Sequence, residues 1–327
     1  MIPKQFVPSL ILAFLAAASC TVTSQNAASS GVNLAQRNGK LVIEVGGKPF
    51  GDYHYQNVPR PYLYPWLGPN GEMLTRHWPM KDVPGEDRDH VHHRSLWFTH
   101  GSVNGHDFWA ETPKSGKIVN QEFVDVKSGK DVGSFTEKNH WIAVDGKLIC
   151  AESRTIRIYN SKPGERMLDF EVTINAVNGE VKFGDTKEGS MAVRVAESMR
   201  VTQPKNQPGR GHIVTSEGVR DKDTWGKRAK WCYYYGPVEG KTIGIAIFDH
   251  PSNPRHPTWW HVRDYGLFAA NPFGVHDFEK KPAGTGDFII PAGQSATFKY
   301  RFYVHEGDEK QAEVEKRYQE YVAATRP

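Results

Sequence analysis

Four histidines, an aspartate and an arginine lie close together near residue 90. They are Asp89, His90, His92, His93, Arg94 and His100. Histidine is the side chain that exchanges protons near neutral pH, and neutral imidazole also binds transition metals. Because titratable side chains gather in functional pockets, the cluster predicts a site for acid–base catalysis or metal binding. The alternative is that these histidines are hydrogen-bonded structural residues where a strand meets a loop.

An extended conformation would distribute these side chains over two faces. His90, His92 and Arg94 would share one face and His93 would lie on the other, because successive side chains of a strand alternate. Two imidazoles spaced by two on a strand face are a common way for β-rich proteins to present nitrogen ligands to a metal. His90 and His92 are therefore the candidate ligands of a divalent transition metal. No third ligand is evident nearby, so the sequence leaves open whether a cofactor binds.

A second segment adds carboxylates and another arginine. Arg194 lies between Ala192 and Ala196 on one strand face, and these small neighbours leave room for a ligand beside the guanidinium. Asp185 and Glu188 lie in the turn before this strand and could project over the mouth of a cleft. The alternative is a solvated hairpin tip, as is usual for charged loop residues. The predicted catalytic residues are His90, His92, His93, Arg94, Glu188 and Arg194.

A third segment supplies aromatic side chains that could stack on a sugar ring. Trp259, Trp260, His261 and Tyr265 occur together, and Asn271 follows a few positions later. Core packing is the alternative for at least one of the two tryptophans, because adjacent strand residues face opposite ways. The predicted substrate contacts are Asp185, Trp97, His100, Trp259, Trp260, His261 and Asn271.

Alternation of apolar and polar residues dominates the chain after residue 37. A period of two is typical of strands with one wet face, and Asn-Gly and Asp-Gly pairs between such runs predict hairpin turns. We therefore predict one antiparallel all-β domain over residues 37–327, with two large sheets packed face to face. The clearest runs are residues 155–159, 168–176, 243–247 and 298–304.

One helix is predicted, at the end of the chain. Apolar residues recur at helical spacing over residues 314–322. Asp308 and Gln311 before them have the spacing of a capping box, in which each side chain accepts a hydrogen bond from the backbone of the other. We expect this helix to close the sandwich.

The N-terminal residues resemble an export signal. Residues 6–18 form an apolar run too short to span a bilayer, so residues 1–19 are predicted to be a signal peptide. The run ends before Cys20 in a sequence similar to a lipoprotein box, which predicts lipid attachment there. Ordinary cleavage after Ala18 is the alternative. Residues 20–36, rich in small and polar side chains, are predicted to be a flexible tether. We expect an exported protein of the periplasm or cell envelope.

Composition excludes some partners and leaves the cysteines open. The net charge of +4 comes from charges spread along the chain, with no dense basic run, so no nucleic acid is expected as a partner. No later stretch approaches the roughly 20 apolar residues of a membrane helix, and membrane contact is expected only through the lipid anchor. Cys150 and Cys232 could form a disulfide outside the cytoplasm or remain buried thiols.

Three segments carry a resemblance to a bacterial family. Residues 89–97 resemble the Asp-His-x-His-His-Arg-Gly signature of DUF6807, often labelled "PmoA family", with Ser95 where glycine is usual. Residues 183–194 and 249–263 resemble the same family, and the similarity runs over roughly residues 40 to 305. The resemblance implies a fold similar to the galactose-mutarotase supersandwich and genomic association with carbohydrate degradation. It does not imply methane oxidation, since the methane monooxygenase subunit with that name is an integral membrane protein.

Two functions remain after these observations. The first is an exported carbohydrate-active enzyme in which a histidine of the cluster and Glu188 or Asp185 act as an acid–base pair on a sugar or oxidised sugar. Epimerisation, elimination, hydration and hydrolysis all use such a pair, although a retaining glycosidase is less favoured because no second acid is convincingly placed. The second is a lipid-tethered glycan-binding protein. The convergence of titratable residues favours the enzyme.

Overall fold

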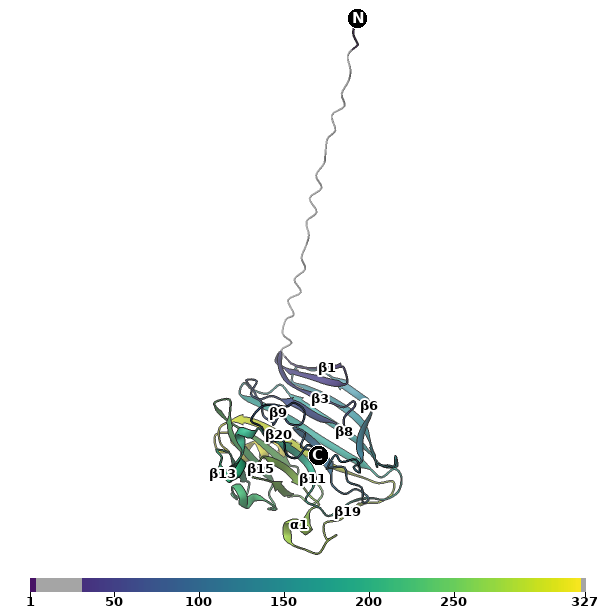
Figure 1. Ribbon diagram of the computed structural model, residues 1–327, viewed down its shortest axis with the longest axis vertical. Coiled ribbons are helices and arrows are strands. Elements are labelled where there is room, and N and C mark those ends of the chain that lie inside the picture. Colours follow the sequence, from purple (N-terminus) through teal and green to yellow (C-terminus); the bar gives the residue numbers. More distant parts are fainter. Residues whose placement is uncertain (4–30, 325–327) are drawn as a thin grey trace.

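The computed structural model describes residues 1–3 and 31–324 and contains two large antiparallel sheets (Figure 1). The first sheet has the spatial order β1 (Val32–Arg37), β2 (Lys40–Val45), β3 (Lys48–His54), β4 (Tyr62–Trp66), β5 (Leu96–His100), β11 (Gly189–Arg194), β18 (Leu267–Asn271) and β17 (Trp259–Val262). The second has the order β14 (His212–Thr215), β15 (Trp231–Val238), β16 (Lys241–Asp249), β20 (Ser295–Glu306), β9 (Glu165–Asn175), β8 (Leu148–Tyr159), β7 (Val132–Ile142) and β6 (Lys117–Lys127).

The remaining elements are short. Two small ladders pair β10 (Val181–Phe183) with β19 (Phe288–Ile290) and β12 (Thr202–Gln203) with β13 (Gln207–Pro208). The helices are α1 (Val275–Glu279), α2 (Val314–Ala324) and the 3-10 turns η1 (Glu197–Met199), η2 (Pro204–Asn206) and η3 (Asp221–Thr224). The expected all-β architecture of two antiparallel sheets with a C-terminal helix is confirmed, and α1 is a short helix that the sequence did not predict.

The core lies between the two sheets and follows the predicted alternation. In β9 the side chains of Leu168, Phe170, Val172 and Ile174 are buried, and the residues between them are partly exposed. Side chains from both sheets meet in this layer, where the rings of Phe98 on β5 and Phe298 on β20 lie 6.4 Å apart. Burial of alternate apolar side chains is the main stabilising contribution to such a sandwich.

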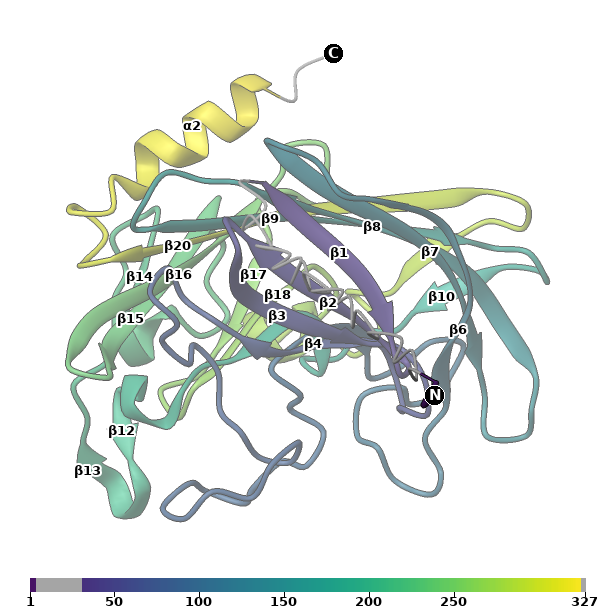
Figure 2. The same cartoon turned by 90° about the horizontal axis from the view of Figure 1, so that it is seen from above.

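One predicted wet face is covered instead. Arg301 and Tyr303 on β20 are buried although they point away from the inter-sheet core. Helix α2 lies over this outer face (Figure 2). Its side chains Tyr318 and Tyr321 pack against Phe248 of β16. The apolar stripe of the helix therefore explains why the strands beneath it are buried on both faces.

The predicted capping box forms just ahead of α2. The backbone N–H of Asp308 donates to Oε1 of Gln311 at 3.0 Å, and the N–H of Gln311 donates to Oδ1 of Asp308 at 2.9 Å. These bonds close the turn of residues 308–313, and the regular helix begins at Val314.

The folded domain begins earlier than expected. Strand β1 starts at Val32, within the range predicted to be a tether, and pairs along its length with β2. Val32 and Leu34 are buried in the core, which accounts for their ordering. The predicted signal peptide, the lipidation site Cys20 and the rest of the tether lie outside the described residues, apart from residues 1–3.

The two remaining cysteines do not form the disulfide that was one of the alternatives. Cys150 on β8 and Cys232 on β15 are free and buried, and burial raises the pKa of both thiols well above the usual range. Within the described part of the chain, no helix is both long and apolar enough to cross a bilayer.

A polar network is buried inside the sandwich near β7 and β8. Arg154 donates from Nε to Oε1 of Glu152 at 2.7 Å and from Nη1 to the hydroxyl of Tyr53 at 2.7 Å. The Tyr53 hydroxyl donates in turn to Glu137, which also accepts from the amide of Asn139 at 2.9 Å. One cation thus stabilises two carboxylates that have been removed from water.

Replacing this arginine tests the network. Arg154→Met leaves two buried carboxylates without a cation, and we expect a loss of about 3–5 kcal/mol in the free energy of unfolding, measured by chemical denaturation. Arg157→Met on the same strand is the control, because Arg157 makes a partly exposed ion pair with Glu171 at 3.5 Å that is worth about 0–1 kcal/mol. Equal losses in the two variants would contradict the prediction.

Candidate active site

A pocket of about 610 Å³ lies on the face of the first sheet that points away from the core. A row of paired residues crosses this face from His261 on β17 through Ala269 and Ala192 to Trp97 on β5. Because the side chains of the two alanines are short, they leave space above the middle of the row, and side chains from the surrounding loops converge there. The pocket is lined by His90, His92, His93, Gly101, Asp107, Trp109, Ala110, Lys187, Glu188, His261, Arg263, Tyr265 and Leu267.

The histidine cluster is a turn, and its three rings point into one pocket. The predicted alternation of faces is wrong, because His90 has a φ of 42° and the N–H of His93 donates to the carbonyl of His90 at 3.0 Å. In this left-handed turn, the ring centres of His90 and His92 each lie 4.6 Å from the ring centre of His93. Strand β5 begins only at Leu96, after the turn.

The rings are held in a stack that reaches from the pocket into the protein. His90 lies between Tyr265, at 5.3 Å and 10° between planes, and His93, at 4.6 Å and 8°. His93 lies in turn against the buried Trp97 at 5.5 Å. Stacking on both faces limits the rotation of His90 even though its side chain is 39% exposed. The ring is thus positioned before any ligand binds.

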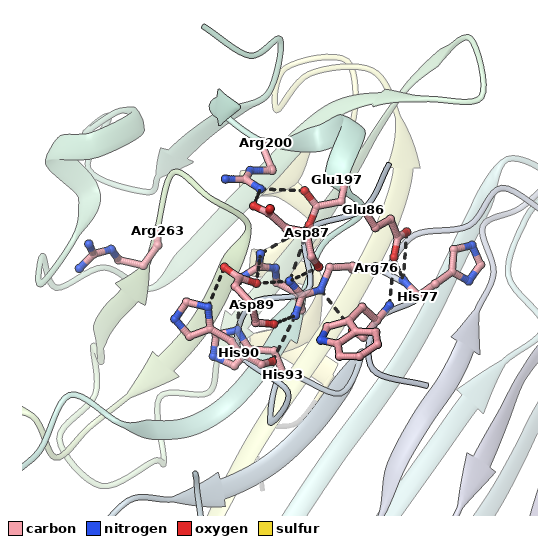
Figure 3. A network of polar contacts seen from close by, with 12 residues as sticks. Arg76, His77, Glu86, Asp87, Asp89, His90, His93, Glu197, Arg200 and Arg263 are labelled. Atoms are coloured by element: carbon pink, nitrogen blue, oxygen red, sulfur yellow. Dashed lines mark hydrogen bonds and ion pairs between the residues drawn. The ribbon is translucent and has the colours of Figure 1, made fainter. Parts of the chain in front are cut away.

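Asp89 connects this stack to a network of arginines (Figure 3). Its carboxylate accepts hydrogen bonds from Nδ1 of His90 at 2.7 Å, from Nη2 of Arg194 at 3.1 Å and from Nη1 of Arg76. Both arginines are fully buried and also lie near Glu197, at 3.8 and 3.5 Å. Partial burial of Asp89 acts to raise its pKa, but the His90 hydrogen bond and the Arg194 and Arg76 guanidiniums outweigh it and lower the pKa well below the usual range.

The hydrogen-bond partners fix the proton positions on three imidazoles. His90 donates from Nδ1 to the Asp89 carboxylate, which leaves Nε2 as the atom that can accept a proton. His93 Nδ1 lies 3.3 Å from Arg194, and His261 Nδ1 lies 3.0 Å from the indole nitrogen of Trp225. Arginine and indole only donate, so both of these imidazoles accept at Nδ1 and carry their proton on Nε2.

Burial keeps the other histidines of the pocket neutral. It lowers the pKa of His261 to about 3, assisted by the charges of Arg263 and Lys187. It likewise lowers the pKa of His92 to about 3, assisted by Arg60. The pKa of His93 is also lowered by burial and by Arg194. The pocket thus combines a His90 that can accept a proton with neutral imidazoles that can donate hydrogen bonds.

Five of the thirteen predicted catalytic and substrate-contact residues line the pocket. They are His90, His92, His93, Glu188 and His261. Arg194 lies behind the pocket wall, where it contacts Asp89 and His93 and holds its guanidinium 5.0 Å from the Tyr265 ring centre. Its position supports the site without lining it, because burial between these partners leaves no surface of Arg194 exposed.

The other predicted catalytic residue lies outside the pocket. Arg94 forms a two-pronged ion pair with Glu111 at 2.8 and 2.8 Å and lies over the ring of Tyr62. Glu111 also pairs with the buried Arg60 at 2.7 Å. The strength of this paired contact draws Arg94 away from the cluster that precedes it.

The predicted aromatic wall is also absent from the pocket. Trp260 is fully buried and donates to the carbonyl of Ala229. Trp259 is 6% exposed, donates to Glu279 at 2.9 Å and lies under the guanidinium of Arg228. Loops and α1 cover this edge of the first sheet, so both faces of β17 are buried and the alternation of the strand exposes neither ring.

The remaining predicted contacts hold the loop that carries Glu188. Asn271 donates to the carbonyls of Thr186 and Lys187 at 3.0 and 2.9 Å. His100 is buried with its Nε2 bonded to the carbonyl of Gly184 at 2.7 Å. Asp185 accepts from backbone N–H groups at positions 276 and 286. These side chains are committed to protein partners, as Trp97 is in the ring stack.

Several functional candidates were missed by the sequence interpretation. Asp107 and Trp109 come from the loop between β5 and β6, where Asp107 accepts from the backbone of Trp109 at 2.6 Å. No periodicity marks this loop, so only the fold brings it to the pocket. Asp89 was visible in the cluster, and its position directly before His90 was the available signal.

Among the described residues, no three His, Cys, Asp or Glu side chains are arranged to hold a metal ion.

The proton positions can be measured by NMR. At pH 7 we expect the ring of His261 to be neutral with its proton on Nε2, and to stay neutral at pH 5, because its pKa is lowered to about 3. Protonation should begin only as the pH falls toward that value. Long-range ¹H–¹⁵N spectra of the wild type and of Trp225→Phe, which removes the donor to Nδ1, check this. A charged His261 ring at pH 6 would contradict it.

Comparison with known proteins gives a family and a set of distantly similar structures, of which three follow. A search of the curated proteins gave no match. Heparan sulfate lyase HepC from Pedobacter heparinus is 9% identical with a TM-score of 0.35, covering 86% of this chain and 36% of that one. A galactose mutarotase related enzyme from Lactobacillus acidophilus is 10% identical with a TM-score of 0.26, covering 85% and 97%. An aldose epimerase homologue from C. elegans is 7% identical with a TM-score of 0.30, covering 86% and 100%.

These structures are carbohydrate enzymes or their homologues by name, and the chain spans about a third of the length of the lyase. Identities and TM-scores this low assign no activity. Ser95, which stands where the resemblance to the DUF6807 signature has glycine, has a φ of 59°, a backbone conformation that favours glycine. The family model of DUF6807, a family of unknown function, matches residues 40–319, and the chain therefore belongs to that family.

Proposed function

We propose that the chain is a carbohydrate-active enzyme that carries out acid–base chemistry on a sugar, of the epimerase, lyase, hydratase or hydrolase type. The observation that carries this proposal is the Asp89–His90 pair, joined at 2.7 Å in the wall of a pocket of about 610 Å³. A carboxylate that orients an imidazole through Nδ1 and leaves Nε2 toward a ligand is a common arrangement for a general base.

The buried arginines support the base through Asp89. Because Arg76 and Arg194 favour the ionised carboxylate, Asp89 stays an acceptor for His90 Nδ1–H over the working range of pH. When Nε2 takes a proton from a substrate, the imidazolium that forms lies beside a carboxylate that stabilises it. Arg76 and Arg194 therefore act as positioning residues in this proposal.

A second proton-transfer group comes from another loop. Glu188 lines the pocket and pairs with Lys187 at 2.9 Å. Both side chains are partly exposed, so either can reach a ligand. Epimerisation and elimination each need one group to remove a proton and another to deliver one, and His90 with Glu188 or Lys187 meets that need.

The composition of the pocket favours a ligand rich in hydroxyl groups. Neutral imidazoles can donate from Nε2, Glu188 and Asp107 can accept, and the aromatic residues Trp109 and Tyr265 also line the pocket. Small-molecule pockets usually combine such surfaces with a few well-placed polar groups. The alternative of glycan binding through Trp259 and Trp260 loses its basis, since both rings are buried.

We propose in addition that the enzyme is exported. Support comes from the sequence of residues 1–19, which has the short apolar run and small-residue end of a signal peptide. Lipidation at Cys20 remains part of this proposal.

Variants of the Asp–His pair test the function. His90→Gln should lower turnover of a sugar substrate about 10²–10⁴-fold with ligand affinity nearly unchanged, since it removes a proton acceptor rather than a binding contact. Asp89→Asn should also lower turnover, because it no longer favours the imidazolium. Turnover is measured by NMR in D₂O with aldoses, uronic acids and glycosides, where exchange of a carbon-bound proton or a new product is observed.

A surface pair provides the matched control. His212 and Asp221 lie 3.8 Å apart on the exposed part of the second sheet and the turn beside it, outside the pocket. His212→Gln and Asp221→Asn should leave turnover unchanged. Full activity of His90→Gln, or no reaction with any of these sugar classes, would overturn the proposal.

A further inference from the structure

One wall of the pocket presents positive charge. Arg263, just after β17, lines it together with His261 and with Lys187 from the loop before β11. All three side chains belong to the lining of the same pocket. Elements far apart in the sequence thus bring three nitrogen donors to the same region.

Arg263 differs from the other arginines around the site. Its guanidinium forms no ion pair with an acidic side chain of residues 31–324, and it lies 5.5 Å from the ring centre of Tyr265 and 5.8 Å from that of Trp225. Figure 3 shows it apart from the network, without a dashed line to any residue drawn. The arginines that do pair with acids here are Arg60, Arg76, Arg94, Arg194 and Arg200.

The neighbouring groups complete an anion site. Lys187 is offset by Glu188 at 2.9 Å, so Arg263 supplies the uncompensated charge. His261 accepts from Trp225 at Nδ1 and therefore offers a neutral Nε2–H donor. A planar guanidinium binds a carboxylate through two parallel hydrogen bonds, and an additional N–H donor strengthens such a site.

We propose that this wall binds the carboxylate of an acidic sugar, and that Arg263 determines the preference for acidic over neutral sugars. The inference rests on the proposed function and names its substrate class. A cation that has no acidic partner among residues 31–324 and lies in a partly buried pocket is stabilised by an anionic ligand. Sugar acids provide that charge together with the hydroxyl groups that the rest of the pocket suits.

The geometry also relates this anion site to the base. The His90 ring and the Arg263 guanidinium lie 5.3 and 5.5 Å from the centre of the same Tyr265 ring. Tyr265 therefore contacts both the ring proposed to accept the proton and the guanidinium proposed to bind the carboxylate.

Binding measurements on the full folded domain test the proposal. Calorimetric titration with D-glucuronate and D-galacturonate, and with D-glucose and D-galactose as neutral counterparts, should show at least tenfold tighter binding of the acids to the wild type. Arg263→Gln should weaken uronate binding about tenfold or more, since it removes a charged hydrogen-bond pair. It should change the affinity for neutral sugars by no more than about threefold by the same reasoning.

Two further variants make the result specific. Arg210→Gln removes an equal charge from an exposed position between β13 and β14 and should leave the uronate preference intact. Arg263→Lys keeps the charge and should retain part of the preference, which a merely structural role for Arg263 would not predict. Equal binding of uronates and neutral sugars by the wild type, or equal effects of Arg263→Gln and Arg210→Gln, overturns the proposal.

The two proposals fail in different ways. If a neutral sugar is turned over by the wild type and not by His90→Gln, while uronates are neither preferred nor bound, the enzymatic function holds and the acidic-sugar class is wrong. If uronates bind with Arg263-dependent affinity but no sugar is turned over, the anion site holds and the enzymatic function is wrong.

Discussion

The ionised carboxylate of Asp89 is the interaction on which the candidate site depends. Two buried arginines, one preceding the histidine turn and one at the end of β11, hold it in place, and it in turn holds His90. These contacts join the histidine turn to Arg76, which precedes it, and to Arg194 at the end of strand β11. Without that carboxylate the arginines would be left near Glu197 with too little negative charge, and the turn that carries the three imidazoles would lose its anchor.

Around this anchor, burial separates two kinds of histidine. His93 and His261 are desolvated next to cations and are neutral hydrogen-bond donors, whereas His90 is more exposed and faces a carboxylate. The same residue type therefore serves two purposes within one pocket, and hydrogen-bond partners behind the pocket wall decide which. The arginines around the site follow the same principle: those that position other groups are paired with acids, whereas Arg263, which lines the pocket, has no acidic partner in the described part of the chain.

The sequence was informative where periodicity carries the signal. Strand alternation predicted the core face of β9, and the spacing of Asp308 and Gln311 predicted their paired hydrogen bonds. His90, His92 and His93 line one pocket, but the relative directions of their rings follow from a left-handed φ at His90 that the sequence does not indicate, since the residue is not glycine. Trp259 and Trp260 were misplaced because loops bury both faces of β17. The sequence could not predict that Arg263 has no acidic partner among residues 31–324, because the pairing of a side chain is decided by the folded structure.

The two outer faces of the sandwich are used differently. The second sheet is closed by α2, whose tyrosines pack on it, while the first sheet is left to the loops that form the pocket. The inter-sheet core therefore shares few side chains with the site, being separated from it by the thickness of a sheet. Substitutions of pocket residues can therefore alter ligand recognition without repacking the inter-sheet core. The residues that would contact a ligand are therefore largely distinct from the residues that stabilise the fold.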